Sequence, residues 1–289
     1  MKKNIAGLTR IIILLLVIGV TLSACTQPTA KTENITTADN GTKQTENTYA
    51  VSESAIQSDA TTSASETDAE TDFYDSNLIG LSVNAIGDSY FEGNGLKSEY
   101  VWLNLMAKKY AIDMNNYGKN GSTVSNYVTE YNPMCERYAK MTETYTDIIL
   151  IEGGKNDFNK NVPIGTEESR DTKTFSGALN VIIDGMKEKY PDAMIVCISP
   201  WNFTGTNGNG QSYLDYANAM REVAKAQDVF YIRACDPTVS GVNMQDSSFR
   251  AQYCMKSTDV SHLNAEGMKI AMAHFEKILS EYYQIFLSA

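Results

Sequence analysis

Short apolar runs alternate with helix-like patterns along residues 81–286, and this alternation constrains the fold more than any other feature. The clearest run is 148–151, where Ile-Ile-Leu-Ile follow one another without a polar interruption. A strand that is apolar on both sides is typical of a parallel sheet covered by helices on both faces. The pattern therefore predicts an α/β domain with a parallel sheet.

The periodicity places strands and helices in turn along the chain. Runs compatible with strands lie at 81–86, 112–117, 147–151, 193–198 and 229–232. Stretches with helical spacing lie at 101–110, 175–190, 213–227 and 265–286. Asn264 can cap the last helix, because its side chain can accept a hydrogen bond from the first turn.

Polar sequences follow the predicted strands. They are Gly-Asp-Ser at 87–89, Tyr-Gly-Lys-Asn-Gly at 117–121, Gly-Gly-Lys-Asn-Asp at 153–157 and Pro-Trp at 200–201. The carboxyl ends of parallel strands meet at one edge of the sheet, and ligands bind there. We therefore expect these sequences to converge on one site.

The chain has two histidines, and a serine hydrolase needs one of them as a base near neutral pH. His274 falls on the predicted last helix, where a surface or partly packed histidine is ordinary. His262 falls in a polar loop before that helix, and Asp259 precedes it by three residues. A carboxylate so placed can accept from one ring nitrogen and leave the other to take a proton. His262 is the candidate base, although a capped loop without a catalytic role is an alternative.

Ser89 is the candidate nucleophile, because it follows a predicted strand in a sharp Gly-Asp-Ser turn. Attack on an ester builds negative charge on the carbonyl oxygen, and preorganised donors must meet that charge. The backbone N–H groups of Ser89 and Gly121 and the side-chain amide of Asn156 can supply them. Taken singly, each of these sequences is also ordinary turn or loop chemistry.

Taken together, four short sequences resemble the SGNH, or GDSL, hydrolase family. They are Gly-Asp-Ser-Tyr-Phe-Glu-Gly at 87–93, the glycine at Gly121, Gly-Lys-Asn-Asp at 154–157 and Asp-Val-Ser-His at 259–262. They come in the family's order, and the resemblance covers nearly all of residues 81–285. Each lies after a predicted strand or before the last helix, so position and residue type agree.

The resemblance implies a three-layer α/β/α fold with a flavodoxin-like sheet, and hydrolysis of carboxylic esters. It implies Ser89 as nucleophile, His262 as base and Asp259 as the group that orients His262. It also implies an oxyanion hole made by Ser89, Gly121 and Asn156. A serine nucleophile predicts a two-step reaction through an acyl-serine intermediate, which requires no metal or organic cofactor.

Three aromatic residues bear on the substrate. Trp201 and Phe203 stand at the base of an Asn/Gly-rich loop that extends to Gly210, where they can form a platform for a sugar. Core aromatics beneath a variable loop are an equal alternative. Tyr90 stands where many members of the family carry a smaller or aliphatic residue, so it is expected to narrow the pocket.

The N-terminus, residues 1–24, resembles a bacterial export signal. It joins Lys2, Lys3 and Arg10 to an apolar run that is too short to span a membrane. Leu-Ser-Ala-Cys at 22–25 resembles the lipobox, which predicts lipid on Cys25 and an exported lipoprotein anchored to the membrane. An ordinary signal with a chance cysteine is the alternative.

Residues 25–75 are rich in Thr, Ser, Ala, Asn and acidic residues, with few large apolar side chains. Such a segment cannot bury enough surface to offset the entropy of ordering, so we predict an acidic tether. The hydrolase domain is then 76–289. The whole chain has a net charge of −11, and the domain is acidic and has no basic run, which argues against nucleic acid as a partner.

The expected substrate is an O-acetyl or other short acyl ester of carbohydrate, because an exported, tethered enzyme meets surface glycans. A lipase or lysophospholipase is the alternative enzyme. A solute-binding lipoprotein would need two lobes, and an inactive glycan-binding relative would not need Ser89, Asp259 and His262 intact. Four cysteines in the domain permit two disulfides, and their pairing and the oligomeric state stay open: Cys135, Cys197, Cys235 and Cys254.

Overall fold

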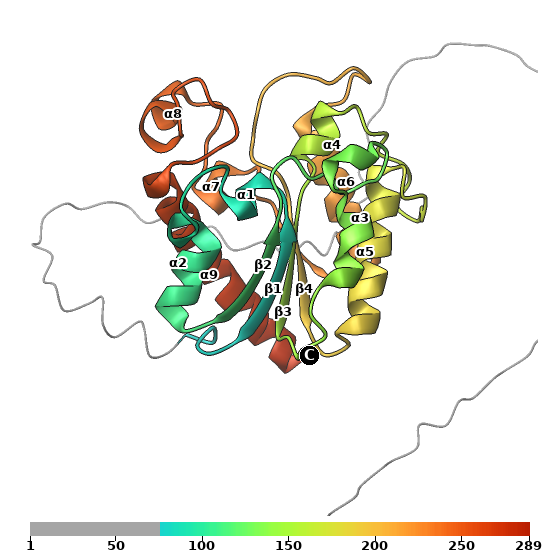
Figure 1. Ribbon diagram of the computed structural model, residues 1–289, viewed down its shortest axis with the longest axis vertical. Coiled ribbons are helices and arrows are strands. Elements are labelled where there is room, and N and C mark those ends of the chain that lie inside the picture. Colours follow the sequence, from blue (N-terminus) through green and yellow to red (C-terminus); the bar gives the residue numbers. More distant parts are fainter. Residues whose placement is uncertain (1–75) are drawn as a thin grey trace, which may run out of the picture. The chain divides into compact units, whose positions relative to one another are not determined.

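One parallel sheet of five strands forms the centre of the computed structural model, which describes residues 76–289 (Figure 1). The strands are β1 (Ser82–Gly87), β2 (Asp113–Gly118), β3 (Ile148–Glu152), β4 (Met194–Ile198) and β5 (Phe230–Ile232). Their order across the sheet is β2-β1-β3-β4-β5. The predicted signal, tether and Cys25 lie outside the described residues.

The sheet confirms the predicted α/β fold. All residues of β3 and β4 are buried, as expected for apolar strands covered on both faces. The chain passes from β1 outward to β2 and then returns to β3 on the other side of β1. This reversal places a switch point between the carboxyl ends of β1 and β3, where such folds bind ligands.

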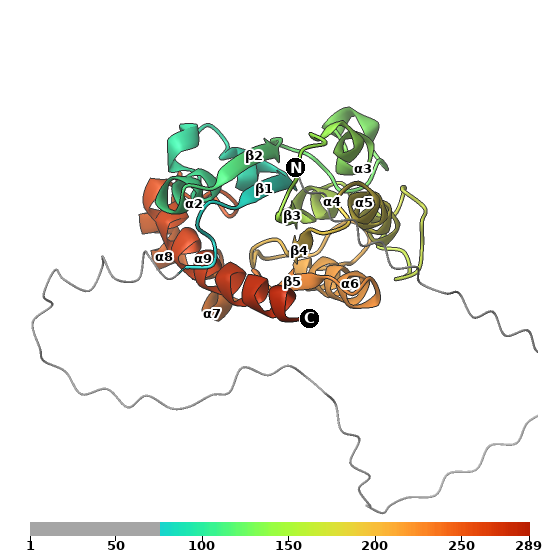
Figure 2. The ribbon, with the colours of Figure 1, turned by 90° about the horizontal axis from the view of Figure 1, so that it is seen from below.

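Helices cover both faces of the sheet (Figure 2). One face carries α2 (Trp102–Tyr110) and α9 (Ala265–Ser288), and the other carries α3 (Met134–Arg137), α5 (Phe175–Lys189) and α6 (Tyr213–Ala226). Trp102 and Phe275, with ring centroids 4.8 Å apart, join α2 to α9. Phe175 and Tyr216, with centroids 5.2 Å apart, join α5 to α6. The structure is therefore a three-layer α/β/α arrangement with one apolar core on each side of the sheet.

Short helices that the periodicity did not predict lie in the connections. They are α1 (Ser89–Glu92), α4 (Lys155–Asn159), α7 (Pro237–Ser240) and α8 (Ser247–Tyr253). Helices of one or two turns give too few residues for an apolar period to show. Both α1 and α4 follow a strand almost at once, so they carry residues at the carboxyl edge of the sheet.

The four cysteines of this region are free and buried. Cys197 on β4 is fully buried and packs as a core residue, as its place in the predicted strand suggested. Within residues 76–289, no helix is long and apolar enough to cross a membrane.

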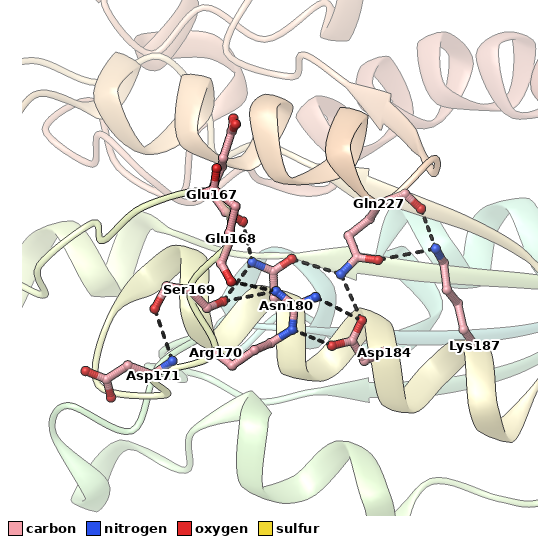
Figure 3. A network of polar contacts seen from close by, with 9 residues as sticks. All are labelled: Glu167, Glu168, Ser169, Arg170, Asp171, Asn180, Asp184, Lys187 and Gln227. Carbon is pink, nitrogen blue, oxygen red and sulfur yellow. Dashed lines mark hydrogen bonds and ion pairs between the residues drawn. The ribbon is translucent and has the colours of Figure 1, made fainter. Parts of the chain in front are cut away.

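A polar network fastens the connection between α4 and α5 to the outer helices (Figure 3). The buried Asn180 amide on α5 donates to the carbonyl oxygens of Glu167 and Ser169 at 2.7 and 2.9 Å. Its oxygen accepts from Gln227 Nε2 at 2.9 Å. The neighbouring ion pair between Arg170 and Asp184 is half exposed, at 48% and 45%. The hydrogen bonds of the buried Asn180 amide, and not the surface ion pair, should therefore stabilise this connection.

We predict that Asn180→Ala lowers the free energy of unfolding by about 2–3 kcal/mol, because it removes the three hydrogen bonds made by a buried amide. Arg170→Ala should cost less than about 1 kcal/mol, because exposed ion pairs contribute little. Urea unfolding of both variants measures the difference. A larger loss for Arg170→Ala would contradict the assignment.

Candidate active site

Ser89 is the first residue of α1, directly after β1. The Asp88 carboxylate caps this short helix, since Oδ1 accepts the Tyr90 N–H at 2.9 Å. Gly87 leaves no room for a side chain, because a Cβ there would lie 2.6 Å from Phe91 Cδ2. The sequence Gly-Asp-Ser thus turns the chain tightly at the strand end and leaves Ser89 7% exposed at the carboxyl edge of the sheet.

The loop before α9 brings His262 and Asp259 to Ser89. His262 Nε2 lies 3.2 Å from Ser89 Oγ, and His262 Nδ1 lies 3.0 Å from Asp259 Oδ2. The loop is held in turn by the Met255 N–H, which donates to the His262 carbonyl at 3.0 Å. His274 packs elsewhere, where a Cβ on Gly241 would lie 2.6 Å from its ring. Of the two histidines, the structure brings His262 to the serine.

The surroundings of Asp259 favour its ionised form. Burial raises its pKa, but the backbone N–H groups of Ser261 and His262 and the His262 ring outweigh burial, so the pKa lies below its ordinary value. Oδ1 accepts both backbone N–H groups, at 2.9 and 3.0 Å. This leaves Oδ2 to accept from His262 Nδ1–H, and Nε2 is then free to take a proton from Ser89.

Two backbone donors at the site are unused. Within residues 76–289, the N–H groups of Ser89 and Gly121 donate to no acceptor. Gly121 has φ of +74°, and a Cβ built there meets nothing within 4 Å. Its glycine is therefore required by the backbone conformation and not by crowding. Free N–H groups are what an oxyanion hole needs.

Asn156, the third predicted donor, lies at the same edge on α4 but is already engaged. Its Nδ2 lies 2.9 Å from Asp88 Oδ2 and 3.0 Å from the Ser122 carbonyl oxygen. A primary amide has two hydrogens, so both point to protein acceptors here. To stabilise an oxyanion, Asn156 must share a hydrogen with the substrate or release Ser122.

Arg137, which the sequence did not single out, fastens the loops around these donors. Its guanidinium donates to the carbonyl oxygens of Gly87, Tyr117 and Asn132 and to Ser122 Oγ, at 2.5–3.0 Å. Burial lowers the pKa of Arg137 to about 10, so it remains charged at neutral pH. One side chain thus ties the ends of β1 and β2 to the loop that carries Gly121. Its place in a short, unpredicted helix gave no sequence signal.

The aromatic residues proposed for substrate binding are buried. Tyr90 and Trp201 are each 2% exposed and stack on one another, with ring centroids 4.8 Å apart. Phe203 is 1% exposed and lies under the Lys155 ammonium, 4.0 Å from Nζ to the ring centroid. The sugar platform is therefore corrected: neither Trp201 nor Phe203 offers an exposed ring, and both pack as the core aromatics of the alternative. Large aromatic rings occur both in apolar cores and in binding surfaces. The sequence alone does not show which of these two roles Trp201 and Phe203 have.

Within the described part of the chain, no group of His, Cys, Asp or Glu side chains could hold a metal ion. The polar chemistry at the edge of the sheet comes from the serine, the imidazole, the carboxylates and the donors described above.

A sequence profile of the GDSL-like lipase/acylhydrolase family matches residues 85–270. The chain belongs to this family. It is therefore a carboxylic ester hydrolase of the GDSL type, as the four short sequences implied. Comparison with curated protein sequences gave no match.

Several solved structures share the fold of this domain. A protein from Lactobacillus plantarum is 24% identical, with a TM-score of 0.62, over 70% of this chain and 98% of its own. A proposed GDSL-like lipase from Bacteroides uniformis is 21% identical, with a TM-score of 0.53, over 70% and 96%. The psychrotrophic esterase EstA from Pseudoalteromonas, solved with monoethylphosphonate as inhibitor, is 16% identical, with a TM-score of 0.51, over 71% and 99%. At these identities the likeness shows the shared fold.

We predict that Arg137→Lys lowers the rate of ester hydrolysis at least about tenfold, because an ammonium cannot serve the same acceptors as a planar guanidinium. The loss of charged hydrogen bonds should also lower the free energy of unfolding by about 2 kcal/mol. Arg221→Lys, on the exposed pair with Glu222, is the matched control. Activity equal to wild type in Arg137→Lys would refute the role given to the guanidinium.

Proposed function

We propose that Ser89 is the nucleophile of this esterase, His262 its base and Asp259 the group that orients the base. The observation that carries the proposal is the continuous contact from Ser89 Oγ through the His262 ring to Asp259. His262 Nε2 takes the hydroxyl proton as Oγ attacks the ester carbonyl. The alcohol leaves with that proton, and the acyl group stays on Ser89. A water molecule, deprotonated by the same nitrogen, then releases the carboxylic acid.

The carbonyl oxygen becomes negative during both attacks. The unused N–H groups of Ser89 and Gly121 are suited to receive this charge, and Asn156 joins them if it yields the Ser122 carbonyl. Each such donor contributes about 3 kcal/mol to lowering the barrier. No cofactor takes part in this sequence of steps.

We predict that Ser89→Ala lowers kcat for 4-nitrophenyl acetate at least about a thousandfold, because no other oxygen can form the acyl intermediate. Asp259→Asn should lower kcat at least about a hundredfold, because the amide favours the wrong imidazole tautomer. Ser257→Ala, an exposed serine of the same loop, is the matched control. Equal rates for wild type and Ser89→Ala would contradict the role of Ser89 as nucleophile.

For the substrate we propose short acyl esters of carbohydrate, hydrolysed outside the cytoplasm by a lipoprotein anchored through Cys25. The N-terminal sequence supports export and lipidation. A short acyl group is supported by the packing under Ser89, where Tyr90, Phe91 and Trp201 are buried and fill the interior. Two exposed apolar residues beside His262, Met255 and Val260 at 40% and 38%, favour the lipase alternative, since they could cover a longer chain.

Esters of 4-nitrophenol with acyl chains of two to twelve carbons separate these alternatives. We predict that kcat/KM for the acetate exceeds that for the dodecanoate at least about tenfold, because the buried rings of Tyr90, Phe91 and Trp201 occupy the interior next to Ser89. Acetylated glycans should then release acetate with the wild type and not with Ser89→Ala. A kcat/KM that rises with chain length, and falls selectively in Val260→Ser, would support the lipase instead.

A further inference from the structure

Glu152 is a carboxyl group buried in the centre of the sheet without a cation. It ends β3, the middle strand, and is fully buried. Within residues 76–289 it forms no ion pair. Oε2 accepts one long hydrogen bond, from the Asp88 N–H at 3.2 Å, and no donor reaches the buried Oε1. An ionised carboxylate buried with so few donors would be energetically costly. These surroundings therefore favour the protonated, neutral form of Glu152.

Two other buried carboxyl groups lie close to Glu152, and both are better supplied with donors. Asp88 accepts from the Tyr90 N–H and from Asn156, and Asp157 accepts from the Val124 and Ser125 N–H groups at 2.9 and 3.1 Å. A proton shared among these groups therefore belongs on Glu152. Burial and the nearby charges of Asp88 and Asp157 raise the pKa of Glu152 well above its ordinary value. Tyr90 is itself held neutral, since burial, together with the nearby charges of Asp88 and Glu152, raises its pKa well above the ordinary value.

The cations near this cluster act on Asp88. Arg137 donates to the carbonyl oxygen of Gly87, the residue before Asp88, and the charges of Arg137 and Lys155 interact with Asp88. The Asp88 and Glu152 carboxyl groups also interact with one another, and each changes the pKa of the other. One negative charge on Asp88 and one proton on Glu152 satisfy all of these contacts.

We propose that Glu152 is a neutral carboxylic acid in the working enzyme and a positioning residue, whose proton is shared with Asp88. It accepts the Asp88 N–H and donates to the Asp88 carboxylate, and Asp88 holds both the first turn of α1 and the amide of Asn156. The proton also keeps a second negative charge away from the turn where the oxyanion forms. This role rests on the proposed function of Ser89.

The substitution Glu152→Gln tests the protonation state without using activity. Where the folded protein holds a proton that the unfolded chain has lost, stability falls as pH rises. Glutamine cannot ionise, so the melting temperature of Glu152→Gln relative to wild type should rise steadily from pH 5 to pH 8.5. Glu188→Gln, an exposed residue of α5, should show a constant difference. A constant or falling difference for Glu152→Gln would show an ionised Glu152 and overturn the proposal.

The positioning role is tested by kinetics at pH 7 with 4-nitrophenyl acetate. Glutamine keeps both hydrogen bonds to Asp88, so kcat of Glu152→Gln should stay within about threefold of wild type. Glu152→Leu removes both, and kcat should fall at least about tenfold while KM changes less than about threefold. Equal losses of kcat in the two variants would overturn the role. If Glu152→Leu does not fold, the stability measurement decides, and it also stands if the wild type proves inactive on this ester.

Discussion

The site depends on one carboxylate, Asp88, at the point where β1 ends. Its two side-chain oxygens hold the first turn of α1 and the amide of Asn156, and its own N–H is held by Glu152. Ser89 can stand beside free backbone donors because this neighbour fixes the turn. Burial makes such a carboxylate costly, because it removes the charge from water and so raises the pKa of Asp88. Interactions with Tyr90, Glu152, His262 and Asn156 have the opposite effect and lower this pKa. The arrangement therefore requires several donors that converge from separate strands.

A parallel sheet supplies that convergence. Because β1 and β3 are neighbours, the segments that follow them place Ser89 and Asn156 on one edge, although they are far apart in sequence. His262 comes from a third direction, the loop before α9, and α9 is fixed by packing against α2 on one face of the sheet. The distance of 3.2 Å between imidazole and hydroxyl is thus set by the packing of large apolar elements and not by local sequence.

Patterns that repeat over many residues were predictable from the sequence, and contacts between short segments were not. The strands and the long helices follow from apolar spacing, since 148–151 or 265–286 contain enough residues to show it. Ser89, Asp259 and His262 could be selected because few residue types perform proton transfer. Arg137 could not be selected in this way, because its role depends on carbonyl acceptors in three other segments that only the fold brings together. The same holds for Trp201, whose burial depends on Tyr90 and α9.

Glu152 shows how a local exception can point to function. It follows four apolar residues in a strand that is covered on both faces, a position where a carboxyl group breaks the pattern. Natural sequences break local rules mainly where function requires it. Glu152 accepts a hydrogen bond from the backbone N–H of Asp88. The buried carboxyl group therefore lies at the turn that carries the nucleophile. An apolar residue at the same place would fill the space, but it would leave the Asp88 N–H without an acceptor and the Asp88 carboxylate without a proton to share.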